Sequence, residues 1–248
     1  MLTAVAPAPD EAARMPAVAR PRFPARRWPM IRAIVLKELR SLAPLAVLAG
    51  LIELYLVCIL IGLPLPFFRR AEETIPFVAD PYCWWVLAVA GIFGAVAGLW
   101  QTLWESARGT YQFLLHRPLE RHWLFAAKLA TGALLTWLMA GVPLLLYALW
   151  AATPGTHAGP FEWSMSRWAW DAWLALPLFY LGGFLSGLRS ARIFGSRLWP
   201  LAGTAVLFPI VVLLSLAWSP GLAPVVCGAA AAFTLGAIFW VARTRDFS

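Results

Sequence analysis

Six long apolar segments are the feature that most constrains this chain of 248 residues. They run roughly over 42–63, 82–104, 123–150, 169–188, 198–218 and 222–242. Each segment is long enough to cross a hydrocarbon core of about 30 Å, which takes about 20 helical residues. The sequence therefore predicts an all-α fold, a polytopic membrane protein with six transmembrane helices.

The basic residues are distributed very unequally between the two sides of these spans. If alternate loops face alternate sides, one side collects 17 of the 20 Lys and Arg residues, and the other keeps only Arg69, Arg70 and Arg167. The positive-inside rule then places both termini in the cytoplasm. The net charge of +8 follows from this topology. It indicates contact with the anionic lipid bilayer, and no nucleic-acid partner is expected.

The chain divides into two parts by composition. Residues 1–29 are rich in Ala, Pro and Arg, and they are predicted to form a disordered cytoplasmic tail without an assigned function. Residues 30–248 form a single six-span transmembrane domain. Met30 is an alternative start that the sequence leaves open.

The stretch just before the first span has apolar residues on one helical stripe and basic residues on other faces. This pattern predicts a helix lying in the cytoplasmic interface. The alternative is a simple cytoplasmic extension of the first span. The residues concerned are Ile31, Val35, Lys37, Glu38, Leu39 and Arg40.

Small residues spaced four apart indicate where helix backbones approach one another closely. They predict a packed bundle and identify no partner. The positions are Gly94 and Gly98, Gly183 and Gly187, and Gly228, Ala232 and Gly236.

Glu53 is the one ionisable residue deep in a predicted span. A carboxylate there is unfavourable by several kcal/mol unless it is paired, hydrated or protonated. It is a candidate pathway residue, facing a hydrated path, a substrate or a partner subunit. Alternatively, it is a helix-contact residue, protonated or hydrogen-bonded to a neighbouring helix. Lys128, in the first turns of the third span, is expected to extend its ammonium group to the inner interface, and Asp171 is expected to lie near the outer interface beside Arg167.

The sequence predicts no catalytic residues and no metal site. It contains neither the GxxxxGK[ST] pattern of an ATP-binding P-loop nor an HExxH motif. His116, His122 and His157 lack the further ligands that a metal site needs.

The loop between the second and third spans, 105–121, carries the most distinctive pattern. A short helix fits 110–116, with Tyr111, Leu114 and Leu115 as an apolar ridge. Such a ridge, surrounded by charge, suits docking into a groove on a cytoplasmic protein. The alternative is a solvated loop that obeys the positive-inside rule. The basic residues around the ridge are Arg108, Arg117 and Arg121.

In this loop the sequence resembles the permease subunits of ABC-2 type transporters. The resemblance covers residues 30–248 and includes the Lys37-Glu38-Leu39-Arg40 segment and an ending like Arg245-Asp246-Phe247. The pattern after the second span is carried by Glu105, Arg108, Gly109, Thr110, Leu114, Leu115, Arg117, Pro118 and Lys128.

The resemblance implies a permease that works as a homodimer or heterodimer and forms the translocation pathway of an exporter in a bacterial inner membrane. Separate ABC ATPase subunits would hold ATP and Mg, so this chain needs no cofactor and is not itself an enzyme. The loop would act as the coupling helix that docks on the ATPase.

Two alternatives from other classes remain. One is a membrane-embedded enzyme acting on lipid or peptide, and the other is a non-transport membrane scaffold. The sequence leaves open the transported substrate, the direction of transport and the choice between homodimer and heterodimer.

Overall fold

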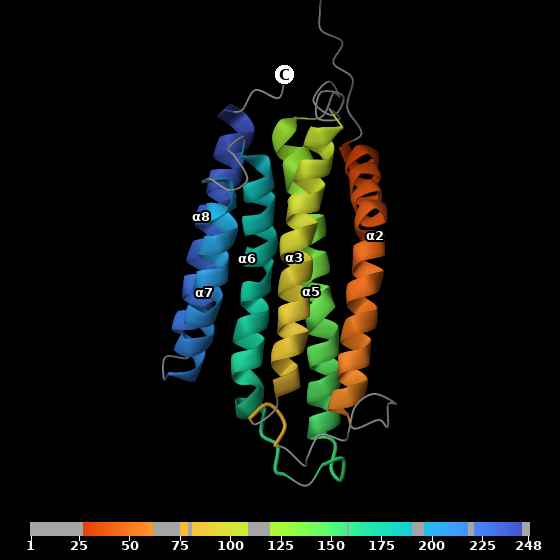
Figure 1. Ribbon diagram of the computed structural model, residues 1–248, viewed down its shortest axis with the longest axis vertical. Coiled ribbons are helices and arrows are strands. Elements are labelled where there is room, and N and C mark those ends of the chain that lie inside the picture. The colour runs from red at the N-terminus through yellow and green to blue at the C-terminus, as the bar shows by residue number, and fades with distance from the viewer. Residues whose placement is uncertain are drawn as a thin grey trace, which may run out of the picture.

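The chain is a bundle of six long helices in a computed structural model (Figure 1). The structure describes residues 27–61, 75–78, 81–108, 120–157, 159–189, 196–217 and 221–244, which contain helices and turns but no strand. The helices are α2 (Arg27–Leu60), α3 (Pro81–Ala107), α5 (Arg121–Ala152), α6 (Arg167–Leu188), α7 (Trp199–Leu216) and α8 (Leu222–Thr244). Two short 3₁₀ helices, η1 (Trp163–Ser166) and η2 (Ser196–Leu198), precede α6 and α7.

The predicted all-helical fold with six spans is confirmed at this level. Six of the described helices are long and apolar enough to cross a membrane, and all six predicted spans coincide with them. We call the end of the bundle where α2 begins and α8 ends the inner end. This is the end that the distribution of charge predicts to be cytoplasmic.

The first helix is longer than the predicted first span. Residues 30–40 do not form a helix of their own, because α2 continues through them and through Pro44 to Leu60. A proline inside a helix removes one backbone hydrogen bond, and transmembrane helices tolerate this loss. The segment is thus the extension of the first span that the sequence left as the alternative. Of the predicted tail, residues 27–29 belong to α2, and residues 1–26 lie outside the described part of the chain.

Helix α6 lies at the centre of the arrangement. It packs against α3, α5, α7 and α8, and its contact with α3 is the most extensive in the bundle. In its most apolar stretch, 83% of the residues are buried within the chain, compared with 17% in α7 and in α8. Figure 1 shows α2 at one edge of the bundle and the α7–α8 pair at the other.

Two glycine motifs face each other where α3 meets α6. A Cβ atom added at Gly98 would overlap the backbone of Tyr180 and Phe184, and one added at Gly183 would overlap the backbone of Ala95. The helix axes can approach this closely only because both positions lack a side chain. These two motifs therefore mark a helix contact, as predicted.

The corresponding prediction for the last span is wrong. Added Cβ atoms at Gly228 and Gly236 would meet no atom within 4 Å, and Ala232 is exposed. These small residues of α8 therefore pack against no other helix among the described residues.

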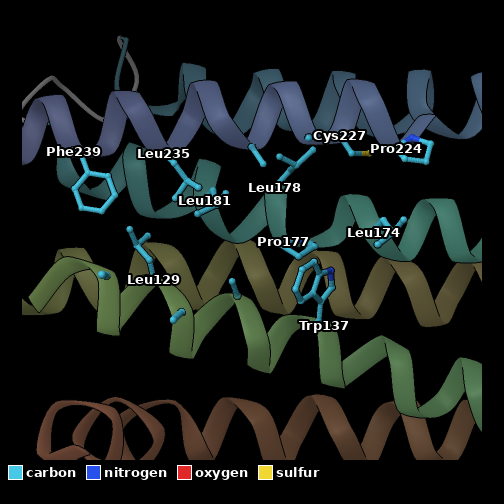
Figure 2. Close-up of a pocket in the computed structure, with 15 residues that line it drawn as sticks. Leu129, Trp137, Leu174, Pro177, Leu178, Leu181, Pro224, Cys227, Leu235 and Phe239 are labelled. Atoms are coloured by element: carbon cyan, nitrogen blue, oxygen red, sulfur yellow. The ribbon is translucent and has the colours of Figure 1, made fainter. Parts of the chain in front are cut away.

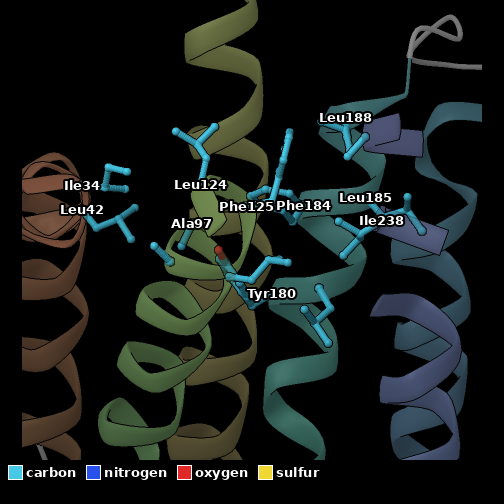
Figure 3. Close-up of a cluster of buried hydrophobic side chains, with 14 of the residues drawn as sticks. Ile34, Leu42, Ala97, Leu124, Phe125, Tyr180, Phe184, Leu185, Leu188 and Ile238 are labelled. Carbon is cyan, nitrogen blue, oxygen red and sulfur yellow. The ribbon is translucent and has the colours of Figure 1, made fainter. Parts of the chain in front are cut away.

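Three apolar clusters fill the interior of the described bundle, and the smallest joins α6, α7 and α8 around Leu178 and Val211. The inner cluster, drawn in Figure 3, joins residues of α2, α3, α5, α6 and α8 around Tyr180, Phe125 and Phe184. The outer cluster includes Phe77, from the connection between α2 and α3, which contacts the ring of Tyr147. The Trp168 indole Nε1 donates a hydrogen bond of 2.8 Å to the Phe77 carbonyl.

Candidate functional site

Four charged side chains join α2, α3 and α5 near the inner end. We call this cluster, made of Lys37, Glu38, Glu105 and Lys128, the charge network. Lys128 Nζ lies 3.0 Å from Glu38 Oε1 and 2.6 Å from Glu105 Oε2. Lys37 Nζ lies 3.4 Å from Glu38 Oε1 and forms a short contact with Glu105 Oε1. Each carboxylate is therefore shared between both lysines.

The charge network is buried and its formal charges cancel. The exposed fraction is 0% for Lys128, 2% for Glu38 and 6% for Glu105, whereas about half of the Lys37 side chain is exposed, at 48%. Desolvating four charges is unfavourable, and their mutual attraction offsets this only while all partners are present. Removing one partner would leave an uncompensated charge inside the bundle.

Helical periodicity places these charges on buried faces. Glu38 lies between Ile34 and Leu42 on one stripe of α2, and both of these neighbours are buried. Lys128 follows the buried Leu124 by four residues on α5. Residues four apart share a helix face, so the apolar neighbours that bury each stripe also bury its charge.

Polar groups from α3 and α6 extend the network toward the middle of the bundle. The Tyr180 hydroxyl lies 2.6 Å from Gln101 Oε1 and 3.0 Å from the Lys128 carbonyl oxygen, and it can donate its proton to one of them at a time. Gln101 lies one helical turn before Glu105 and is 2% exposed. A Cβ atom at Gly132 would overlap the Tyr180 ring, so the glycine makes room for this hydroxyl to reach α5.

Lys128 does not extend to the inner interface, so this expectation was wrong. Its side chain is 1% exposed and turns toward the two carboxylates. Sequence reasoning missed Glu38, Gln101 and Tyr180 as members of one site. A usable signal was present in α3, where Gln101 and Glu105 lie one turn apart on a face that is otherwise apolar.

The predicted docking loop is described only at its two ends. Glu105 belongs to the last turns of α3 and is held in the charge network. Arg108 follows α3, and its guanidinium lies 4.2 Å from the centre of the Trp104 ring. The remaining predicted docking residues lie outside the described residues: Gly109, Thr110, Tyr111, Leu114, Leu115, Arg117 and Pro118.

The residues predicted for an interfacial helix have several environments in α2. Ile31 and Val35 are partly buried against the inner apolar cluster. Leu39 is 39% exposed and Arg40 is also exposed. Lys37 and Glu38 belong to the charge network, which ties this part of α2 to α3 and α5.

Glu53 lies on the same buried face of α2, farther from the inner end. It is 1% exposed, and its Oε1 atom has no hydrogen-bond partner among the described residues. Its neighbours on the buried stripe, Ala49 and Val57, are apolar. Glu53 is thus buried within the chain, and both interpretations of its role remain predictions.

Asp171 lies on α6, near the end of the bundle opposite the inner end. Arg167 Nε is 3.9 Å from Asp171 Oδ2, as the spacing of four residues predicted. The Ser215 hydroxyl also donates a hydrogen bond of 2.5 Å to Asp171 Oδ2. Asp171 therefore connects α6 to α7 at this end.

The charge network connects three helices physically. Its members come from three helices, and two of them flank the loop 109–119: Glu105 on α3 before it and Lys128 on α5 after it.

No family model, no curated protein and no solved structure matches this chain.

Proposed function

We propose that this chain is the membrane-spanning permease subunit of an ABC-2 type ATP-binding cassette transporter, an exporter driven by a separate ATPase subunit. Two copies, or this chain and a related one, form the translocation pathway. Hydrolysis of ATP with Mg takes place in the partner ATPase at the cytoplasmic side. Both termini face the cytoplasm in this proposal.

The observation that carries the proposal is the position of the charge network at the base of the loop between α3 and α5. The Lys128–Glu105 pair joins the two helices that enter and leave this loop, and Lys37 and Glu38 add α2 to the same cluster. A partner pressing on the loop would then displace three helices together. Mechanical coupling of this kind needs two states that the partner contacts differently.

The exposed surface of the bundle supports the membrane part of the proposal. Large apolar side chains are exposed along α2, α5, α7 and α8, including Leu51, Leu146 and Val206, each at least half exposed. Lipid would cover such surfaces in a bilayer. The resemblance in the loop, together with the six spans, favours transport over a scaffold role.

The experiment is a pull-down of the tagged chain in detergent from its native membrane, with mass spectrometry of the proteins that co-purify. We expect a stoichiometric protein with Walker motifs. Leu114→Asp is expected to abolish its recovery while membrane insertion persists, because the new charge lies on the apolar ridge. Thr153→Asp is the control, since it places the same charge on an exposed residue beyond the other end of α5.

Two results would contradict the proposal. One is recovery of the chain alone under conditions that preserve other membrane complexes. The other is an ATPase that is retained equally by Leu114→Asp and Thr153→Asp, because docking would then not involve the loop. If the chain instead co-purified with a lipid or peptide that it had chemically altered, and with no ATPase, the alternative of a membrane-embedded enzyme would be favoured.

A further inference from the structure

A long apolar groove runs along the bundle between α5 and α8, with α6 as its floor. Its cavity volume is about 600 Å³. Figure 2 shows Leu129 and Trp137 on the α5 side, Leu178 and Leu181 on the floor, and Phe239 on the α8 side. The volume lies within the range of about 300–1,000 Å³ that is typical of small-molecule sites.

Small residues form part of each wall of the groove. Ala130 and Ala133 line it on α5, and Gly228 and Ala231 line it on α8. A Cβ atom at Gly228 would meet no atom within 4 Å, so the space beside this glycine is open. The lining is almost entirely hydrocarbon, so the groove suits a flexible apolar chain and offers little to a polar ligand.

The groove is longer than the hydrocarbon depth of one membrane leaflet. At the rise of an α-helix, it extends over about 17 Å on α5, from Ala126 to Trp137, and over about 22 Å on α8, from Pro224 to Phe239. Half of a hydrocarbon core measures about 15 Å. Ala126 and Phe239 lie toward the inner end, so the groove begins within the inner leaflet, and it continues beyond that depth to Pro224 in the first turn of α8.

Basic residues follow the groove at the inner end. Arg243 comes four residues after Phe239 on α8, so it continues the same helix face toward the interface. Arg121 opens α5, just before Ala126, and is exposed. A ligand with its tail in the groove would thus have its headgroup close to positive charge.

We infer that the groove binds one acyl chain of an anionic phospholipid of the inner leaflet, with Arg243 at the headgroup phosphate. Lipid tails are as apolar as the groove, so burial of the tail alone gives no preference over bulk lipid. Selectivity therefore comes from close packing against α6 and from attraction between the headgroup and the basic residues. The inference rests on the membrane location of the bundle and is independent of an ATPase partner.

The test uses phosphatidylglycerol with a photoactivatable group on its acyl chain, in phosphatidylcholine vesicles that contain the full chain. Adducts are mapped by mass spectrometry of peptides. We expect adducts on α5 and α8 within the groove, and loss of most of them in Gly228→Phe, whose ring fills the groove. Gly236→Phe is the matched control, because this α8 glycine also has open space around it but does not line the groove.

A second variant tests the headgroup. In Arg243→Gln, phosphatidylglycerol is expected to lose its advantage over a phosphatidylcholine probe of the same chain length, whereas Arg40→Gln, at an exposed position of α2, keeps it. Equal labelling by both probes in the unmodified chain would overturn the anionic specificity. Equal adducts in Gly228→Phe and Gly236→Phe would overturn the groove as the site. The same peptide maps would also show any crosslink between two copies of the chain. If Gly228→Phe removed such a crosslink and left the lipid adducts unchanged, the groove would bind a second copy of the chain, and the inference would be overturned.

Discussion

The ammonium group of Lys128 lies between carboxylates from two other helices, with almost no exposure to solvent. In such surroundings a charge is stable only if it is paired, and here the pairing involves residues far apart in the chain. The charge network therefore makes the relative positions of α2, α3 and α5 depend on individual side chains.

The first prediction concerns the removal of the buried cation. Lys128→Met leaves Glu38 and Glu105 close together with only Lys37 to balance them, so we expect a loss of about 3–5 kcal/mol in the free energy of unfolding. The measurement is unfolding in detergent followed by circular dichroism. Lys37→Met serves as the comparison and should have the smaller effect, because about half of its side chain is exposed, at 48%.

A double variant distinguishes charge imbalance from lost packing. Adding Glu38→Gln to Lys128→Met restores the balance of charge and should recover part of the lost stability. If the two effects simply add, the carboxylate and the ammonium are not energetically coupled, and the pairing described above would be contradicted.

The second prediction concerns Glu53, whose Oε1 atom is buried without a hydrogen-bond partner among the described residues. A buried polar group left unsatisfied costs about 1–3 kcal/mol, so Glu53→Leu should raise the unfolding temperature in detergent. Glu53→Gln keeps a polar group and should change it less. A lower unfolding temperature for Glu53→Leu would mean that the carboxyl makes a stabilising contact.

At the scale of elements, the contact between α3 and α6 depends on positions that have no side chain. Gly98 and Gly183 each face backbone atoms of the other helix. Backbone atoms cannot rotate away as side chains do, so any added volume must separate the helices. This contact ties the central helix to the rest of the bundle.

We therefore predict that Gly98→Ala lowers the free energy of unfolding by about 1–3 kcal/mol through overpacking. The control in the same helix is Gly91→Ala, whose added Cβ would meet only side-chain atoms, the nearest at 3.4 Å. Thermal unfolding of both variants in the same detergent checks this. Equal unfolding temperatures for the two would show that the helices adjust without loss.

The elements themselves could largely be predicted from the sequence, because length and apolar composition determine a membrane span. The pairing of elements could not. Gly94 and Gly98 have the same spacing as Gly228 and Ala232, yet among the described residues only the former pair packs against another helix. The same limit explains the error for Lys128, because its partners precede it in the sequence by 90 and 23 residues and only the tertiary arrangement brings them together.

For the whole molecule, the asymmetry of charge determines how the bundle is expected to lie in the membrane. If alternate loops face alternate sides, the sequence assigns 17 of the 20 basic residues to the side of the inner end. The charge network lies close to this end, where a cytoplasmic partner could reach the loop next to it. The orientation is thus a separate and testable part of the proposal.

We predict that the inner end of the bundle faces the cytoplasm. Alkaline phosphatase, which is active only outside the cytoplasm, should be inactive when fused after Ser248 and active when fused after Thr153, beyond the opposite end of α5. Immunoblots of both fusions control for expression. The reverse pattern of activity would place the inner end outside and remove the loop from any cytoplasmic ATPase.

The central position of α6 has a consequence for the biogenesis of the protein. Its span is the least apolar of the six candidate spans and the most buried. A segment of this kind gains little by partitioning alone from the translocon into lipid. Because α3 and α5 are synthesised earlier and provide its packing surface, α6 is expected to leave the translocon only when these helices are already beside it. Assembly of the bundle would then begin during translation, before α7 and α8 have been made.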